Sequence, residues 1–184
     1  RSNTGETSFH KLAHMVYKNE LTVVQVNDKI QNLNENYGKD EHFENSLNST
    51  SFFKEKNTSE ISYLFYELES YMNQQAKSTF SLLPFTRFID KYGGKLSIEH
   101  IDPQEPLNRE QSVLVHKLGN LVITTQNSKL SHKEFPNKRT IYKNSDFIVE
   151  RSLANLRKWD NQQIKKRTRE ILKFCKQRWS LKNK

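Results

Sequence analysis

The fold is decided by one stretch of sequence, which reads Ser-Ile-Glu-His-Ile-Asp-Pro-Gln over residues 97–104 and Leu-Gly-Asn-Leu-Val-Ile-Thr over residues 118–124. Pro103 ends the first apolar segment, because proline has no N–H for a strand ladder and fixes its own φ angle. A Gly-Asn pair then opens the second apolar run, which predicts the returning strand of a small β-hairpin. Asn127 follows that strand at a point where a helix can start. The stretch therefore predicts two strands followed by a short helix.

Three side chains in this stretch suit metal-assisted cleavage of a phosphodiester. The neutral imidazole of His100 is fitted near pH 7 to take a proton from an attacking water molecule. The carboxylate of Glu99 and the amide oxygen of Asn127 are hard oxygen ligands, which suit a largely hydrated Mg²⁺ ion. Each residue also has a structural alternative: a buried strand histidine, an exposed strand carboxylate and a helix cap. Because Glu99 and His100 are adjacent, their side chains should leave the strand toward opposite faces.

The same residues belong to a longer pattern. It comprises Glu-His-Ile-Asp-Pro-Gln (99–104), Leu-Gly-Asn-Leu (118–121), Asn127, Leu-Ser-His (130–132) and Phe-Pro-Asn-Lys (135–138). This pattern resembles the HNH group of the His-Me finger nucleases and, more narrowly, the C-terminal nuclease domain of GmrSD-type modification-dependent restriction enzymes. His132 stands where that family often has Asn, and Trp159 and Trp179 bracket the last helix as they do in the family. The resemblance covers roughly residues 58–180.

The resemblance implies a mainly α-helical fold with a small β-hairpin, in which a ββα-metal site is embedded in a helical domain. It further implies a metal-dependent DNA endonuclease that uses one Mg²⁺ or Mn²⁺ ion and acts in anti-phage restriction. His100 would be the general base, and Asn120 would hold the histidine loop by side-chain to backbone hydrogen bonds. Glu99 and Asn127 would bind the metal ion, and His132 is a further candidate beside it.

The same resemblance implies that the chain is the C-terminal part of a longer enzyme of the bacterial cytoplasm. The start at Arg1 rather than Met agrees with that expectation. The missing partner would be an N-terminal nucleotide-hydrolysing domain that senses modified DNA. Two other functions stay open: a DNA-binding module with an inactive nuclease centre, and an RNase of the same fold. Nicking and double-strand cleavage are both compatible with these residues.

Composition excludes several other classes of protein. The 184 residues are 34% hydrophobic and 28% charged, with a net charge of +9 at pH 7. No apolar run approaches the length that crosses a membrane. Cys175 is the only cysteine, which excludes an internal disulfide and a structural zinc site built from cysteines.

The positive charge is concentrated at the C-terminal end. Residues 151–184 contain twelve Lys and Arg against two Asp and Glu, whereas residues 1–150 contain eighteen against nineteen. Such a run is either a solvated helix face or a surface that neutralises nucleic-acid phosphates, and the nuclease motif favours the second. The predicted DNA contacts are Lys129, Lys133, Lys138, Arg139, Lys165, Lys166, Arg169, Lys173 and Lys176.

Hydrophobic periodicity and caps predict the remaining organisation. Helices are predicted over residues 7–18, 21–36, 60–75 and 161–179, with Thr22 and Ser59 as caps of the second and third. Residues 39–57 are predicted to be a mostly polar connection, Pro136 to help end a short helix, and His116 to be a packing or surface residue. Residues 1–90 would form a helical platform and residues 91–184 the nuclease region with its basic C-terminal helix, together one compact unit.

Overall fold

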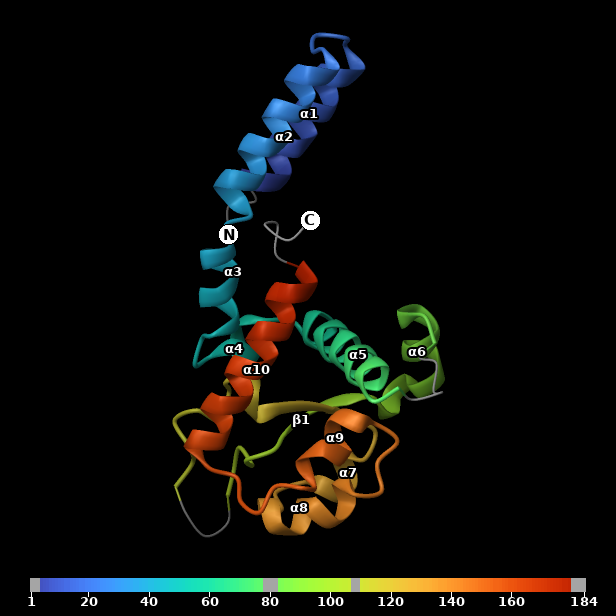
Figure 1. Cartoon of the computed structure of the whole chain (residues 1–184), viewed down its shortest axis with the longest axis vertical. Coiled ribbons are helices and arrows are strands. Elements are labelled where there is room, and N and C mark those ends of the chain that lie inside the picture. Colours follow the sequence, from blue (N-terminus) through green and yellow to red (C-terminus); the bar gives the residue numbers. More distant parts are fainter. Residues whose placement is uncertain (1–3, 78–82, 107–109, 180–184) are drawn as a thin grey trace. The chain divides into compact units, whose positions relative to one another are not determined.

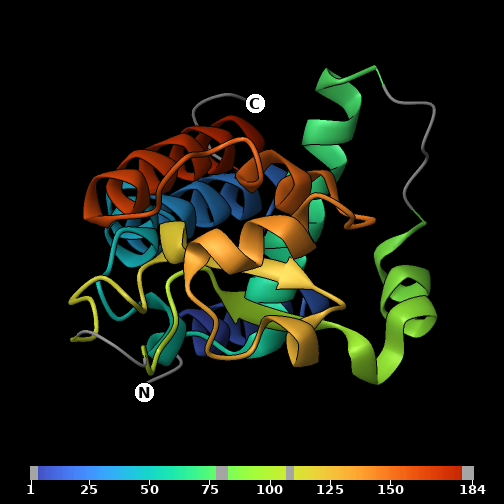
Figure 2. The same ribbon diagram turned by 90° about the horizontal axis from the view of Figure 1, so that it is seen from below.

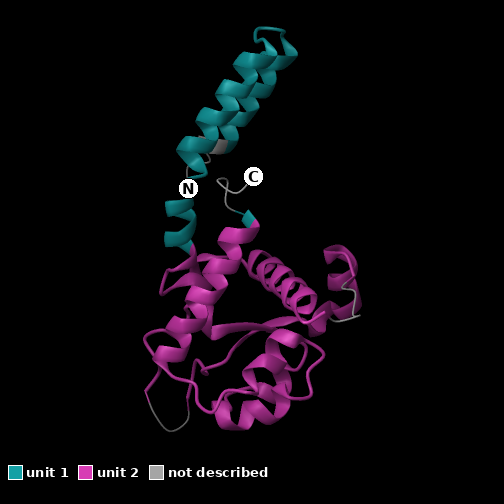
Figure 3. Cartoon of the chain, in the orientation of Figure 1, with its two compact units in different colours: residues 1–46, 179–184 teal, residues 47–178 magenta. Residues whose placement is uncertain are grey.

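The structure, a computed structural model, describes residues 4–77, 83–106 and 110–179. Within these ranges it is mostly helical and contains one two-stranded antiparallel sheet, as Figure 1 shows. The prediction of a mainly α-helical chain with one small pair of strands is thereby confirmed. The chain divides into two compact units, residues 1–46 with 179–184 and residues 47–178 (Figure 3).

The first unit contains two paired helices and most of a third. These are α1 (Thr4–Tyr17), α2 (Val23–Tyr37) and α3 (Asp40–Leu47). Thr22 caps α2 as predicted, because its hydroxyl accepts a hydrogen bond from the Gln25 N–H. The Gln25 side chain in turn accepts a hydrogen bond from the Thr22 N–H. This reciprocal pair satisfies backbone donors that the first turn of a helix leaves open.

The connection over residues 39–57, which the sequence predicts to be mostly polar, contains two short helices that the sequence did not predict, with residues 48–51 between them. It forms α3 and a second short helix, α4 (Phe52–Glu55). Leu47 and Phe52 are both buried and supply the apolar contacts of this connection. Helices as short as these show no repeated apolar spacing, which is why the periodicity did not predict them.

The second unit holds the motif of residues 97–138 and the helices around it. The helical elements before the motif are α4, α5 (Thr58–Gln75), α6 (Phe85–Tyr92) and the 3₁₀ turn η1 (Gly93–Lys95). Within and after it come η2 (Leu118–Asn120), α7 (Asn127–Leu130), α8 (Phe135–Tyr142), α9 (Ile148–Leu153) and α10 (Asn161–Trp179). The bounds of α10 agree with the predicted last helix. None of the described helices is long and apolar enough to span a membrane.

The sheet lies at the centre of the second unit. Strands β1 (Ser97–His100) and β2 (Leu121–Thr124) pair antiparallel, with Ser97 opposite Thr124 and His100 opposite Leu121. Helix α5 packs against both strands, while α7 packs against β1 and α9 against β2. Figure 1 shows α5 on one side of the sheet and α7 to α9 on the other, and Figure 2 shows the sheet from below. Every residue of β2 is buried, because helices cover both faces of this strand.

The boundary between the two units falls after residue 46, whereas the sequence predicts one after residue 90 within a single compact unit. The difference arises from α5, which belongs with the sheet and not with the N-terminal helices. Its apolar face is buried through Ile61, Leu64, Phe65 and Leu68. Because α5 packs on both strands, it belongs to the same unit as the sheet.

Two helix ends also differ from prediction. The cap of α5 is Asn57 and not Ser59, since the Asn57 side chain accepts a hydrogen bond from the Glu60 N–H at 2.8 Å. Pro136 lies in the first turn of α8 and so begins this helix instead of ending one. Proline is favoured there because the first helical turn leaves its N–H groups unpaired.

Candidate active site

A cavity of about 400 Å³ opens beside the end of β1. Glu99 and His100 line it from β1, Asn127 from the first residue of α7, and His132 from the segment that follows α7. The structure thus brings together the predicted general base, both predicted metal ligands and the further histidine candidate. Residues separated by more than thirty positions in the sequence meet here because β1 pairs with β2 and α7 packs on β1.

The carboxylate of Glu99 is held by a buried lysine, Lys138 of α8. The Lys138 Nζ lies 2.5 Å from Oε1 of Glu99 and donates a second hydrogen bond to the backbone carbonyl of His100 at 2.7 Å. The Lys138 side chain is 0% exposed, so the prediction that it contacts DNA is wrong. Burial raises the pKa of Glu99, and the neighbouring ammonium opposes that rise. Such a pair is needed because a buried charge without a partner is strongly unfavourable.

The imidazole of His100 leaves β1 in a different direction, toward α4 and the segment before η2. Its ring meets Phe53 edge-on at a centroid distance of 4.5 Å, and its Nε2 lies 3.3 Å from Nδ1 of His116. Burial lowers the pKa of His100 to about 3, with smaller contributions from His116 and Lys138. The ring is therefore neutral near pH 7, which is the state in which it can accept a proton.

Asn120 is fully buried, and its side chain uses its whole hydrogen-bonding capacity. The Oδ1 atom accepts from the Asp102 N–H at 2.8 Å and from the indole N–H of Trp159 at 2.9 Å. The Nδ2 atom donates to the carbonyls of Asp102 at 3.0 Å and Val115 at 2.8 Å. These bonds tie the segment that follows His100 to the residue that precedes β2. In the sequence Trp159 only marks the approach to the last helix, and no local signal there indicates this contact.

Helix α10 supports the Asn120 turn through close backbone contact. The Gly119 N–H donates to the Thr168 hydroxyl at 3.2 Å. The guanidinium of Arg167 donates to the carbonyls of Gly119 and Leu121 at 2.8 and 2.6 Å. A Cβ atom at Gly119 would lie 2.2 Å from the Ile164 carbonyl oxygen, so only glycine permits this approach. Arg167 was missed from the sequence because nothing distinguishes it there from the other basic residues of the helix.

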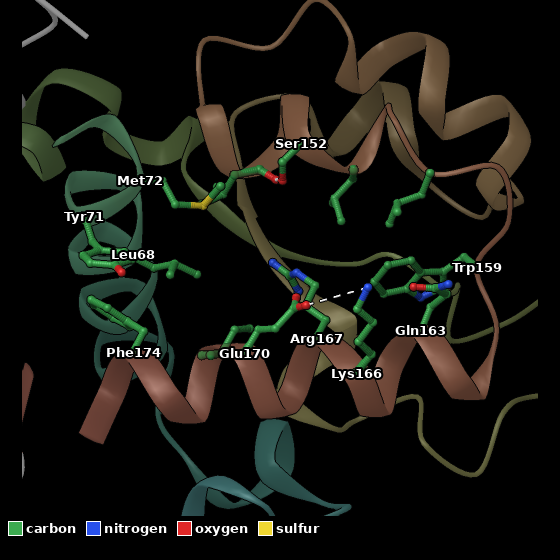
Figure 4. A pocket seen from close by; sticks show the side chains of 14 residues that line it. Leu68, Tyr71, Met72, Ser152, Trp159, Gln163, Lys166, Arg167, Glu170 and Phe174 are labelled. Carbon is green, nitrogen blue, oxygen red and sulfur yellow. Dashed lines mark hydrogen bonds and ion pairs between the residues drawn. The ribbon is translucent and has the colours of Figure 1, made fainter. Parts of the chain in front are cut away.

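A second hollow of about 400 Å³ lies between α5, α9 and α10 (Figure 4). Its lining is mostly apolar, and Tyr71 of α5 packs on Phe174 of α10 at a centroid distance of 5.1 Å. Lys166 and Glu170 form an ion pair at 4.0 Å along α10, as the dashed line in Figure 4 shows. None of the predicted catalytic or metal-binding residues lines this hollow, so the cavity beside β1 is the candidate active site.

The other predicted DNA contacts differ in how accessible they are. Arg139 is half-buried, and its guanidinium donates twice to the Ala154 carbonyl at 3.2 Å, which ties α8 to the end of α9. The remaining residues are exposed, namely Lys129, Lys133, Lys165, Lys166, Arg169, Lys173 and Lys176. These basic residues of α10 lie outside its buried face, which packs within the second unit. A basic stripe on the surface of this helix therefore exists as the sequence predicts.

The predicted metal ligands do not form part of a large acidic or histidine cluster. Across residues 4–77, 83–106 and 110–179, no group of three or more His, Cys, Asp and Glu side chains is arranged to hold a metal ion. The predicted pair of ligands is of another kind, because it combines one carboxylate with one amide oxygen.

Comparison with known proteins gives one family. No curated protein matches the chain in sequence. The model of the family described as GmrSD restriction endonucleases, C-terminal domain, matches residues 37–174. This segment contains the sheet, the cavity beside β1, the Asn120 turn and most of α10, so the resemblance drawn from the motif is confirmed. The chain belongs to the C-terminal domain family of the GmrSD restriction endonucleases.

Proposed function

We propose that this chain is a DNA endonuclease domain of the HNH type, which hydrolyses phosphodiesters with a divalent metal ion and acts in anti-phage restriction. The observation that carries the proposal is the cavity that Glu99, His100 and Asn127 line together. Membership of a restriction endonuclease family supports the nuclease activity. The order of strand, strand and short helix is the order expected of a ββα-metal site.

His100 is the proposed general base for the attack of water on the phosphodiester. Its neutral ring takes a proton from the water molecule while the water oxygen bonds to phosphorus. The bond between phosphorus and the 3′ oxygen breaks in line with this attack, and the departing oxygen takes a proton from solvent. The products carry 5′-phosphate and 3′-hydroxyl ends. Asn120 supports this step by fixing the backbone on either side of the β1–β2 connection.

Glu99 and Asn127 are the proposed ligands of one Mg²⁺ or Mn²⁺ ion. Lys138 pairs with Oε1 of Glu99, so the second carboxylate oxygen is not needed for that ion pair. Asn127 is exposed and lines the same cavity. Two protein oxygens fit a cation that keeps most of its water molecules, and weak binding is expected. A bound ion of this kind polarises the scissile phosphate and stabilises the departing oxygen.

DNA is the proposed substrate, and the basic stripe of α10 is proposed to track its backbone. Phosphate contacts from lysine and arginine position a protein on DNA without reading its sequence. Lys129 and Lys133 are exposed, and each is next in the sequence to a residue that lines the cavity, so they are proposed as further phosphate contacts. The partner in the parent enzyme is proposed to be an N-terminal nucleotide-hydrolysing domain that senses modified DNA in the bacterial cytoplasm.

Supercoiled plasmid incubated with and without Mg²⁺ tests the proposal. Relaxed or linear plasmid with the metal ion, and none after chelation with EDTA, would support it. Retardation of uncut plasmid in a gel would favour the inactive DNA-binding module, and cleavage of RNA alone would favour the RNase. EDTA should leave the thermal unfolding midpoint nearly unchanged, because few protein ligands hold the ion. Collapse of the fold on chelation would contradict a weak catalytic site.

A further inference from the structure

A second histidine, His116, contacts the proposed general base directly. Its Nδ1 lies 3.3 Å from Nε2 of His100, and the two rings cross at 84° with centroids 5.4 Å apart. His116 lies in the connection between β1 and β2, sixteen residues after His100. The contact therefore depends on how this connection folds back on the end of β1.

The position of His116 is fixed by two neighbours. Its ring is stacked on Phe53 with an interplanar angle of 11° and a centroid distance of 6.0 Å. Its carbonyl accepts a hydrogen bond from the Phe53 N–H at 3.0 Å. The preceding residue, Val115, is held by the side chain of Asn120. His116 thus reaches His100 from a braced segment, as a residue that orients a reactive side chain must.

The contact between the rings determines which nitrogen of His100 can act as a base. A neutral imidazole has one N–H and one lone-pair nitrogen, so in this contact one ring donates and the other accepts. If His116 donated, His100 would carry its proton on Nδ1, and its Nε2 lone pair would be occupied. If His100 donates from Nε2, its Nδ1 stays unprotonated, and none of the described residues forms a hydrogen bond with Nδ1.

We infer that His116 is a positioning residue, which accepts a hydrogen bond from the Nε2–H of His100 and thereby keeps Nδ1 as the proton acceptor. The same bond stabilises the imidazolium that forms when His100 takes a proton from water, because that cation donates from both ring nitrogens. His116 acts only through His100 in this role. The inference rests on the proposed function, but the tautomer of His100 is a property of the folded chain without substrate.

The tautomer is measured by long-range ¹H–¹⁵N correlation NMR on the ¹⁵N-histidine-labelled chain near pH 7.5, without DNA or metal ion. The expected result is a protonated Nε2 and an unprotonated Nδ1 for His100, changing to a mixture in His116→Phe. A protonated Nδ1 in the wild type would overturn the inference. A wild-type chain without nuclease activity would overturn the proposed function alone, because the NMR result does not depend on activity.

Two variants separate the hydrogen bond from the packing of the ring. His116→Phe keeps a ring against Phe53 and has no acceptor, whereas His116→Asn loses the stacking and keeps an acceptor oxygen near the position of Nδ1. The phenylalanine variant should lower kcat by about 10- to 100-fold with little change in KM for plasmid, as other orienting residues do. The asparagine variant should recover most of that loss. Activities that follow the thermal unfolding midpoints of the two variants would overturn the inference and leave His116 a packing residue.

Discussion

Lys138 and Glu99 form a buried ion pair across thirty-nine residues of sequence, with Nζ and Oε1 2.5 Å apart. The same ammonium donates to the carbonyl of His100, so one side chain links the proposed metal ligand to the backbone of the proposed base. Without a cationic neighbour, a buried carboxyl group shifts toward its protonated form. Lys138 therefore favours the charged state of Glu99 at the cavity.

Replacement of Lys138 should destabilise the fold strongly. Lys138→Met is expected to lower the free energy of unfolding by roughly 3–5 kcal/mol, because it leaves a buried carboxylate without its partner. Urea unfolding followed by circular dichroism measures this change. The exposed Lys133→Met is the matched control and should stay within about 0.5 kcal/mol of the wild type. Adding Glu99→Gln to Lys138→Met should restore part of the lost free energy of unfolding. A Lys138→Met variant as stable as the wild type would show that the buried ion pair of Lys138 and Glu99 does not stabilise the fold.

Replacement of the proposed base should remove cleavage without removing the fold. His100→Gln retains an amide that can bond to His116 but cannot take a proton from water, so the rate should fall by roughly 10²- to 10⁴-fold. Glutamine is preferred to alanine because His100 is buried against Phe53, and truncation would open a cavity. Relaxation of supercoiled plasmid gives the rate, with the exposed His42→Gln as the control. Wild-type rates in His100→Gln would rule out this residue as the base.

Gly119 should tolerate no side chain. Gly119→Ala would bring Cβ to 2.2 Å from the Ile164 carbonyl oxygen and 2.4 Å from the Thr168 hydroxyl, so α10 and the Asn120 turn must separate. We expect a loss of about 3 kcal/mol in the free energy of unfolding, because backbone cannot yield as a flexible side chain does. Gly94→Ala is the control, since a Cβ there meets no atom within 4 Å. Equal stabilities of the two variants would show that α10 is not packed on this turn.

The basic stripe of α10 should govern the salt dependence of DNA binding. Lys165, Arg169 and Lys173 are exposed and four residues apart, so they share one face of the helix. Replacing all three by glutamine should flatten the slope of log affinity against log salt by roughly two to three units. Cleavage at low salt should persist, because the cavity residues are untouched.

Fluorescence anisotropy with duplex DNA at several salt concentrations measures this slope. A matched variant carries three glutamines at exposed lysines of the N-terminal helices and the turn between them, Lys11, Lys18 and Lys29. An unchanged slope in the α10 variant would mean that the stripe is a solvated surface and that the phosphate contacts lie elsewhere.

Glu150 should make the stability of the domain depend on pH. This buried carboxyl of α9 accepts a hydrogen bond from the Ser145 hydroxyl, and burial raises its pKa from 4.5 to about 7. The folded state therefore binds the proton more tightly than the unfolded state, and stability is lost as the pH rises from 4.5 through 7.

The variant Glu150→Gln isolates this effect, because it keeps the shape and cannot ionise. Between pH 5 and pH 8 the wild type should lose up to roughly 3 kcal/mol relative to the variant. Urea unfolding of both proteins at pH 5 and pH 8 gives the difference in the free energy of unfolding between wild type and variant. The contributions of other titrating groups cancel in this difference. A difference that does not change with pH would contradict the raised pKa of Glu150.

Local sequence by itself determined the elements whose signals lie within a few residues of each other. The reciprocal cap of Thr22 and Gln25 places the start of α2, and the apolar spacing from Asn161 to Trp179 gives the bounds of α10. The apolar run that Pro103 ends and the run that the Gly-Asn pair opens specify the two strands, and the motif of residues 99–138 specifies the family. These features are set by contacts between near neighbours in the chain, or by the identity of residues, and need no knowledge of the packed core.

Only the tertiary structure decided what the polar side chains of the site do. The motif includes Lys138, but no local signal indicates that this lysine is buried on Glu99 whereas Lys133, five residues before it, is exposed. The contact of His116 with His100, and the bonds of Arg167 to the Asn120 turn, likewise join distant segments. The physical reason is that burial and charge pairing depend on which segments the sheet and α10 bring into contact. A local sequence pattern shows which residues are present but not which distant residues they contact.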